Sequence, residues 1–247
     1  MIELNDDDFH RVISNTGARP NDAATQNTTR HYSETFSREV ALWLRSKLIS
    51  RNIGSNVLPP EGKVDTIYGI GNRGKSLDVA VLNDSRYLML NISIKTFNFK
   101  DRATKNYRHN YTGRFYELLG EDLDLRRSYE YATLVALILL PEDSISDSNP
   151  SSFAHAVRQF SKIIKKDDAD KGLGFDYVYI GVHSADGKIY FFDAREFPPR
   201  TGEPKEENKQ SVSEIIKNIC FTVAQRETLI ATAKLPVYLP YNFTEPI

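Results

Sequence analysis

Cysteine is almost absent from this sequence. Cys220 is the only one among 247 residues, so no disulfide can form within the chain, and a site built from clustered cysteines is excluded. The neighbours Ile219 and Phe221 are apolar, which favours a small core residue over a nucleophile. Disulfides are rare in reducing compartments, so the composition fits a cytoplasmic protein.

Long apolar runs, zinc-ligand clusters and nucleotide motifs are also lacking. No stretch approaches the roughly 20 apolar residues of a membrane-spanning helix, and the acidic residues 1–8 contain no signal core, so we expect neither membrane insertion nor export. The five histidines are scattered, which argues against zinc. The glycines of residues 69–76 lack the Walker spacing, so we interpret that stretch as a turn and expect no nucleotide cofactor.

Charge is nearly balanced overall but unevenly distributed. A net charge of −1 argues against a purely electrostatic nucleic-acid binder. One segment is nevertheless basic and is opposed only by Asp101; its cations are Lys95, Lys100, Arg102, Lys105, Arg108 and Arg114. Tyr107, His109 and Tyr111 are interleaved with them. Such a segment suits a phosphate backbone, and a solvated loop and helix face is the alternative that the pattern leaves open.

Apolar periodicity predicts a single α/β domain over residues 1–247, with a central mixed β-sheet flanked by helices. Residues 1–32 read as an irregular arm or a short helix, and the stretches 57–62 and 196–210 as loops. Helices are expected at 33–51, with Ser33 as N-cap, and at 115–127, 153–165 and 211–233. Strands are expected at 64–70, 77–82, 87–95, 131–140, 175–183 and 188–192.

Two charged residues occupy informative places in this pattern. Asp78 comes early in the strand 77–82, and Lys95 ends the strand 87–95, with a hairpin turn at 83–86 between them. Pairing of the two strands brings a carboxylate and an ammonium to one edge of the sheet. A metal-dependent phosphodiesterase needs such a pair, because the carboxylate holds Mg²⁺ while the ammonium stabilises charge on the attacked phosphate and places the water.

The order helix, strand, two-strand hairpin, helix, buried strand resembles the PD-(D/E)XK nuclease superfamily, which includes many type II restriction endonucleases. The resemblance covers about residues 33–141 and implies a restriction endonuclease-like core, with 142–247 as an elaboration. It implies that Asp78 is the metal aspartate, Lys95 the motif lysine that assists the attacking water, and Glu39 the helix acid at a Mg²⁺ site. Glu34 competes with Glu39 for that last role.

The sequence departs from this family at Ser93, where an Asp or Glu is expected two residues before Lys95. Some restriction endonucleases with Ser-x-Lys take the missing carboxylate from the following helix, which makes Glu117 and Glu121 candidates, with Glu117 slightly preferred. Another arrangement holds the metal with Asp78, Glu39 and backbone oxygens. Further polar residues that the sequence places near the site are Asn91, one strand period before Ser93, and Asp65.

The resemblance therefore implies a Mg²⁺-dependent type II restriction endonuclease that hydrolyses double-stranded DNA at a specific sequence and leaves a 5′-phosphate. Cleavage of a palindrome needs two-fold symmetry, so a homodimer is expected. The expected DNA contacts are Lys100, Arg102, Lys105, Tyr107, Arg108 and Arg114. Two alternatives stay open: a non-catalytic DNA-binding or assembly module with a degenerate nuclease fold, and an unrelated α/β protein whose Asp78 and Lys95 are merely exposed.

Overall fold

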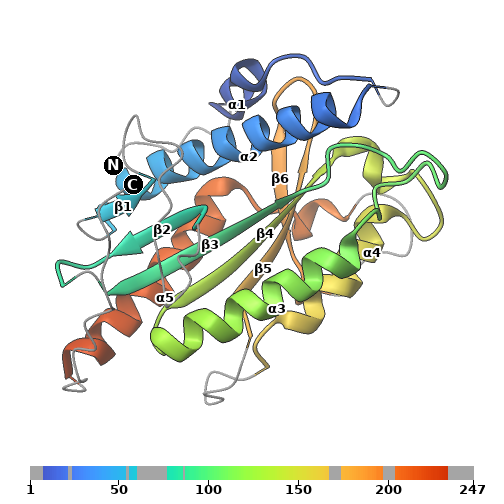
Figure 1. Cartoon of the computed structure of the whole chain (residues 1–247). Helices are drawn as coiled ribbons and strands as arrows, with labels where there is room; N and C mark the ends of the chain where they lie inside the picture. The colour runs from blue at the N-terminus through green and yellow to red at the C-terminus, as the bar shows by residue number, and fades with distance from the viewer. Residues whose placement is uncertain are drawn as a thin grey trace.

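A six-stranded mixed β-sheet organises the chain (Figure 1). The computed structural model describes residues 8–21, 24–53, 56–59, 77–85, 87–166, 174–196 and 204–232. The strands follow one another across the sheet in chain order: β1 (Asn56–Leu58), β2 (Val79–Leu82), β3 (Leu88–Thr96), β4 (Thr133–Pro141), β5 (Tyr177–His183) and β6 (Ile189–Asp193). Strands β3, β4 and β5 are parallel to one another, and the remaining neighbours pair antiparallel.

Helices cover both faces of this sheet, which confirms the predicted α/β class. They are α1 (Phe9–Thr16), α2 (Gln26–Ile49), α3 (Tyr111–Ser128), α4 (Ser152–Phe160) and α5 (Val212–Thr232). One hydrophobic cluster joins α3 and α4 to the sheet, and a second joins α1, α2 and α5 to its other face (Figure 1). None of the helices in the described ranges is long and apolar enough to cross a membrane.

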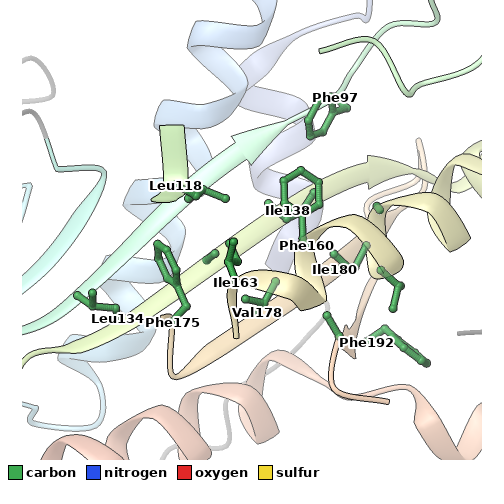
Figure 2. Packing of buried hydrophobic residues seen from close by; sticks show 14 of the residues in the cluster. Phe97, Leu118, Leu134, Ile138, Phe160, Ile163, Phe175, Val178, Ile180 and Phe192 are labelled. Carbon is green, nitrogen blue, oxygen red and sulfur yellow. The ribbon is translucent and has the colours of Figure 1, made fainter. Parts of the chain in front are cut away.

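Strand β4 forms the centre of both clusters, as its continuous apolar sequence predicts. All nine of its residues are buried. Successive side chains point to opposite faces, so Leu134 and Ile138 join the α3/α4 cluster while Val135 and Leu137 join the other. Figure 2 shows Ile138 among residues such as Phe160 of α4. Parallel strands with helices on both faces read as apolar runs for this reason.

Two predicted boundaries near the N-terminus were wrong. Helix α2 begins at Gln26 instead of after Ser33, because the Thr25 hydroxyl caps it by accepting the Thr28 N–H at 3.3 Å. The helix therefore extends by about two turns beyond its apolar stripe. Strand β1 lies where the loop 57–62 was expected, since Val57 pairs with Val81 of β2. The predicted strand 64–70, which contains Asp65, lies outside the described residues, as do 69–76.

The other predicted elements form with shifted ends. Both predicted hairpins, β2–β3 and β5–β6, are confirmed. Helix α3 begins four residues earlier than predicted, at Tyr111, and α4 ends at Phe160 before a short 3₁₀ turn. Part of the predicted loop 196–210 falls outside the described ranges. Because α3 connects the parallel strands β3 and β4, it crosses the face of the sheet onto which alternate residues of β3 project.

Candidate active site

A groove of about 1350 Å³ lies between α2, the end of β3 and the start of α3. Most of the residues that line it are of polar types, whereas most small-molecule pockets are lined predominantly by apolar residues. Four Lys or Arg side chains and two carboxylates contribute to it: Arg30, Arg38, Lys95, Arg114, Glu34 and Asp78. The groove thus concentrates positive charge on a chain whose net charge is −1.

Asp78 lies on the floor of this groove, directly before β2. The pairing of Val79 with Ile92 continues by one residue, which places Asp78 opposite Ser93. Its Oδ2 accepts the backbone N–H of Ile94 at 2.7 Å. Burial raises the pKa of Asp78, and the Ile94 hydrogen bond and the charge of Lys95 only partly oppose that shift. Within the described residues, no cation forms an ion pair with this carboxylate.

Lys95 directs its ammonium to α3. Its Nζ lies 2.9 Å from Glu121 Oε1 and 3.8 Å from Glu117 Oε2. Glu121 is 13% exposed, whereas Glu117 is 45% exposed and is held by Arg114 at 2.7 Å. Glu117 and Glu121 share a helix face because they are four residues apart. The geometry therefore favours Glu121 as the carboxylate from the following helix, although the sequence slightly favoured Glu117.

Ser93 and Asn91 occupy the same face of β3 as Lys95, because all three are separated by two residues. Both are buried, and Asn91 Nδ2 donates to the Ser93 hydroxyl at 3.0 Å. The side-chain oxygen of Asn91, Oδ1, is buried and has no hydrogen-bond partner within the described residues. A neutral amide and hydroxyl thus stand beside Asp78 where the family pattern has a carboxylate.

Glu39, the predicted helix acid, does not join the site. It accepts a hydrogen bond from Asn15 Nδ2 at 2.9 Å and lies 3.6 Å from Arg38, so it faces α1. Glu34 lines the groove instead. Because each helical residue is rotated by about 100° from the one before it, Glu34 and Glu39 lie on different faces of α2. The apolar stripe alone did not indicate which of the two borders the groove.

Tyr107, an expected DNA contact, is a core residue. It is completely buried, and its hydroxyl donates to Asp143 at 2.7 Å while accepting from Arg19 at 3.0 Å. Burial and the Asp143 hydrogen bond raise its pKa well above the ordinary value. Its ring is therefore inaccessible to a base or phosphate. Tyr111 is likewise buried, between Phe97 and Phe160.

The remaining predicted DNA contacts divide into two groups. Arg114 lines the groove, whereas Lys100 forms an ion pair with Asp143 at 2.7 Å and Arg102 donates to the carbonyl of Ala24 at 2.9 Å. Lys105 is exposed and Arg108 partly exposed, and both lie outside the groove lining. Of its six Lys and Arg side chains, the basic segment thus contributes Lys95 and Arg114 to the groove lining, and His109 lies there as well.

A second ionic cluster lies at the opposite end of the parallel strands, and the sequence did not indicate it. We call Asp176, Arg126 and Arg226 the Asp176 cluster. Arg126 lies 2.9 Å from Asp176 Oδ2, and Arg226 donates to both carboxylate oxygens, at 2.7 Å to Oδ2. The Leu134 N–H donates to Oδ2 at 2.8 Å. Burial alone would raise the pKa of Asp176, but the Arg226 hydrogen bonds and both arginine charges lower it.

His183, at the end of β5, is buried against the rings of Phe9 and Phe36. Neither ring nitrogen has a hydrogen-bond partner within the described residues. Burial, assisted by the charge of Arg19, lowers the pKa of His183 to about 4. The imidazole is therefore neutral at pH 7, and its neutral form is a requirement of the packing between α1, α2 and β5.

Two carboxylates, Asp78 and Glu121, are candidates to hold a Mg²⁺ ion. Within the described ranges, no three His, Cys, Asp or Glu side chains group to hold a metal by themselves. Mg²⁺ usually binds one or two carboxylates and completes its shell with water and substrate phosphate. Asp78 and Glu121 are close enough for the charge of Glu121 to raise the pKa of Asp78. This donor set fits a Mg²⁺ that shares its ligands with substrate.

Comparisons of the chain with protein-family models, with curated proteins and with solved structures find no match. The function is therefore inferred from the geometry of the groove.

Proposed function

We propose that this protein is a Mg²⁺-dependent endonuclease with a restriction endonuclease-like core. The observation that supports the proposal is the surroundings of Asp78, which is largely desolvated in the groove near Lys95, whose ammonium pairs with Glu121 of α3. A desolvated carboxylate without a cationic partner is costly unless a metal ion or a proton neutralises it. The element order α2, β2, β3, α3, β4 also supports the proposal, while the predicted strand 64–70 lies outside the described residues.

Each residue has a distinct role in this proposal. Asp78 and Glu121 would hold Mg²⁺, which when bound polarises the scissile phosphate and supplies a nucleophilic water. Lys95 stabilises the negative charge that develops on the attacked phosphate. Glu121 fixes the position of the Lys95 ammonium through their ion pair, and the Ile94 N–H fixes one oxygen of Asp78. Ser93 contributes a neutral hydroxyl and no ligand charge.

The groove suits a polyanionic polymer. Its volume exceeds the roughly 300–1,000 Å³ of small-molecule sites, and cations outnumber carboxylates along its lining. A phosphate backbone binds such a surface by releasing counterions. We further propose double-stranded DNA as substrate, site-specific cleavage of the type II restriction class with a 5′-phosphate product, and a homodimer that matches the symmetry of a palindrome.

A second candidate is a non-cleaving DNA-binding or assembly module. It is favoured by the neutral Ser93 and by the direct Lys95–Glu121 ion pair, which neutralises two groups that cleavage needs. In that case the groove binds DNA, but Asp78 and Glu121 do not hold a metal together. The two candidates agree on binding and differ on hydrolysis.

The discriminating experiment incubates the protein with supercoiled plasmid in Mg²⁺ or Mn²⁺. We expect discrete cleavage, reduced about 10²-fold or more by Lys95→Ala, Glu121→Gln or Asp78→Asn. Two matched controls keep cleavage: Lys188→Ala removes an exposed lysine that is also ion-paired, and Asp193→Asn neutralises a carboxylate outside the groove that pairs with Arg195.

Plasmid retardation without cleavage in either metal would reject the nuclease and support the binding module. Equal cleavage by Glu121→Gln and wild type, together with loss in Glu117→Gln, would reassign the second carboxylate to Glu117.

A further inference from the structure

One face of α2 forms a polar wall of the groove. We call this face the α2 wall and define it as Arg30, Ser33, Glu34, Ser37, Arg38 and Ala41, which all line the groove. Their spacing of three and four residues places them on one side of the helix. The apolar stripe of α2 packs on the sheet, so the wall is the part of the helix left to face the groove.

The two arginines of the α2 wall are weakly engaged. Arg30 pairs with Glu34 at 2.7 Å, and these side chains are 77% and 59% exposed. Arg38 lies 3.6 Å from Glu39 and is 43% exposed. Exposed ion pairs contribute little to stability and are screened by salt, so either guanidinium exchanges its carboxylate for a phosphate at low cost. A guanidinium also matches the geometry of a phosphate better than an ammonium does.

Hydrogen bonds connect the α2 wall to the segment that carries Lys95. The Ser37 and Thr96 hydroxyls lie 3.2 Å apart, and Asn98 Nδ2 donates to the Ser33 hydroxyl at 3.3 Å. Asn98 also lines the groove and is buried, and its Oδ1 has no hydrogen-bond partner within the described residues. These two hydrogen bonds therefore fix the position of the α2 wall relative to the segment that carries Lys95.

We infer that the α2 wall binds the DNA phosphate backbone through Arg30 and Arg38 and thereby sets which phosphate reaches Asp78 and Lys95. The inference rests on the proposed nuclease function. Eight helical residues separate the arginines by about 12 Å along the axis. That distance corresponds to roughly three to four base pairs at 3.4 Å each. Two phosphate contacts so spaced, joined to the catalytic strand, fix the DNA relative to the hydrolytic groups.

The binding experiment measures the affinity for a fluorescein-labelled duplex by anisotropy in EDTA, between 50 and 200 mM salt. Arg30→Ala and Arg38→Ala are each expected to weaken binding roughly tenfold for any sequence and to reduce the salt slope by about one. Arg38→Lys is expected to restore most of the slope. Arg127→Ala, which removes an exposed arginine outside the groove, is the matched control and is expected to leave affinity and slope unchanged.

The cleavage experiment tests the register. In Mg²⁺, Ser33→Ala combined with Ser37→Ala removes both hydrogen bonds to the strand while leaving the arginines. We expect near-wild-type affinity but cuts that spread to neighbouring phosphodiester bonds on a sequencing gel. An unchanged single cut would overturn the register part of the inference.

An unchanged salt slope in the Arg30→Ala/Arg38→Ala double variant, with binding and cleavage intact, would overturn the whole inference and leave the nuclease proposal standing. A wild-type protein that neither binds nor cleaves duplex DNA would instead overturn the proposed function itself. Thermal unfolding of every variant, expected within about 2 °C of wild type for exposed substitutions, verifies that the fold is retained.

Discussion

Each end of the parallel strands holds a partly buried aspartate, but the surroundings shift the pKa values of the two carboxylates in opposite directions. Asp176, at the start of β5, accepts hydrogen bonds from two arginines and a backbone N–H, and its pKa is lowered. Asp78, in the groove near the end of β3, accepts one backbone N–H, and its pKa is raised. Within the described residues, two arginines therefore neutralise Asp176, whereas no cation forms an ion pair with Asp78.

Helix α3 contributes charged side chains to both ends of the parallel strands, acidic ones near Asp78 and a basic one at Asp176. Glu117 and Glu121 face Lys95, while Arg126 lies one turn or more further along and reaches Asp176. Residues of α3 and α5 close the Asp176 cluster, whereas the groove remains open between α3 and α2. Helix α3 thus contributes to the Asp176 cluster at one end and to the proposed active site at the other.

The largest expected effect is the loss of the Asp176 cluster. Asp176→Asn removes the carboxylate that pairs with Arg226 and, among the described residues, leaves Arg126 with Asp122 alone, at 3.5 Å. Removing one partner of a buried ionic group typically costs about 3–5 kcal/mol. We expect the free energy of unfolding, measured by urea denaturation at pH 7, to fall by that amount. Asp193→Asn, which neutralises a carboxylate at the end of β6 that pairs with Arg195, is the control, with a loss below about 1 kcal/mol.

A loss below about 1 kcal/mol for Asp176→Asn would contradict the comparison, since the cluster would then be as dispensable as a surface pair. DNA cleavage by the folded fraction is expected to survive, because no atom of the cluster lines the groove.

The next largest effect is expected at His183, which lies at the same end of the parallel strands as the groove. Its protonation is expected to destabilise the fold at low pH. Its pKa of about 4 in the folded state lies below the ordinary 6.5, so the neutral form favours folding. The contribution of His183 to the free energy of unfolding is fully present above pH 6.5. It is lost as the pH falls toward 4, and the loss amounts to about 3 kcal/mol. The lowered pKa of Asp176 delays its own contribution to acid unfolding to pH values below about 3.8.

The measurement is the free energy of unfolding at pH 7 and at pH 4.5 for wild type and His183→Leu. The variant is expected to lose most of this pH dependence, whereas His109→Leu, an exposed histidine, is expected to keep it. Parallel pH profiles for wild type and His183→Leu would show that acid unfolding starts elsewhere.

Local sequence patterns predicted the strands and the helix α3 that form the groove, but not which face of α2 lines it. Apolar runs located β3, β4 and β5, and the hairpin turn at 83–86 fixed the pairing that brings Asp78 next to Ile94. A period-two strand and a predicted helix therefore sufficed to bring Asp78, Lys95 and the α3 glutamates together. These relations are local or span one crossover, so sequence spacing determines them.

Long-range packing decided what the pattern left open. The rotation of α2 about its axis separates Glu34 from Glu39, and it depends on contacts with α1 that residue spacing does not encode. The sequence suggested that Tyr107 is a surface aromatic in a basic segment. In the structure it is buried, and its hydroxyl donates a hydrogen bond to Asp143, which is 36 residues away in the chain. The Asp176 cluster joins residues 50 positions apart twice, so no local motif indicated it.

Mg²⁺ provides a third way to separate the two ends. A ligand that binds only the folded state stabilises it by RT ln(1 + [L]/Kd), about 1–3 kcal/mol at 10 to 100 times Kd. The proposed site predicts a Tm increase of roughly 3–10 °C for wild type. Asp78→Asn is expected to abolish the increase and Asp122→Asn to retain it, as differential scanning fluorimetry would show. An equal increase in both variants would place the cation outside the groove.

The smallest expected effect has the opposite sign to the first. Because the pKa of Asp78 is raised, ionisation of this carboxylate at pH 7 opposes folding, and the contribution is favourable only at low pH. Asp78→Asn keeps an acceptor for the Ile94 N–H and removes the charge, so without metal we expect a gain in stability of up to about 1 kcal/mol at pH 7. The gain should vanish below about pH 3.8, where the wild-type carboxyl is protonated in both states. Urea denaturation in EDTA at pH 7 and pH 3.5 measures both values. A loss of stability at pH 7 would mean that Asp78 is already neutralised within the chain, and the contrast between the two ends of the sheet would disappear.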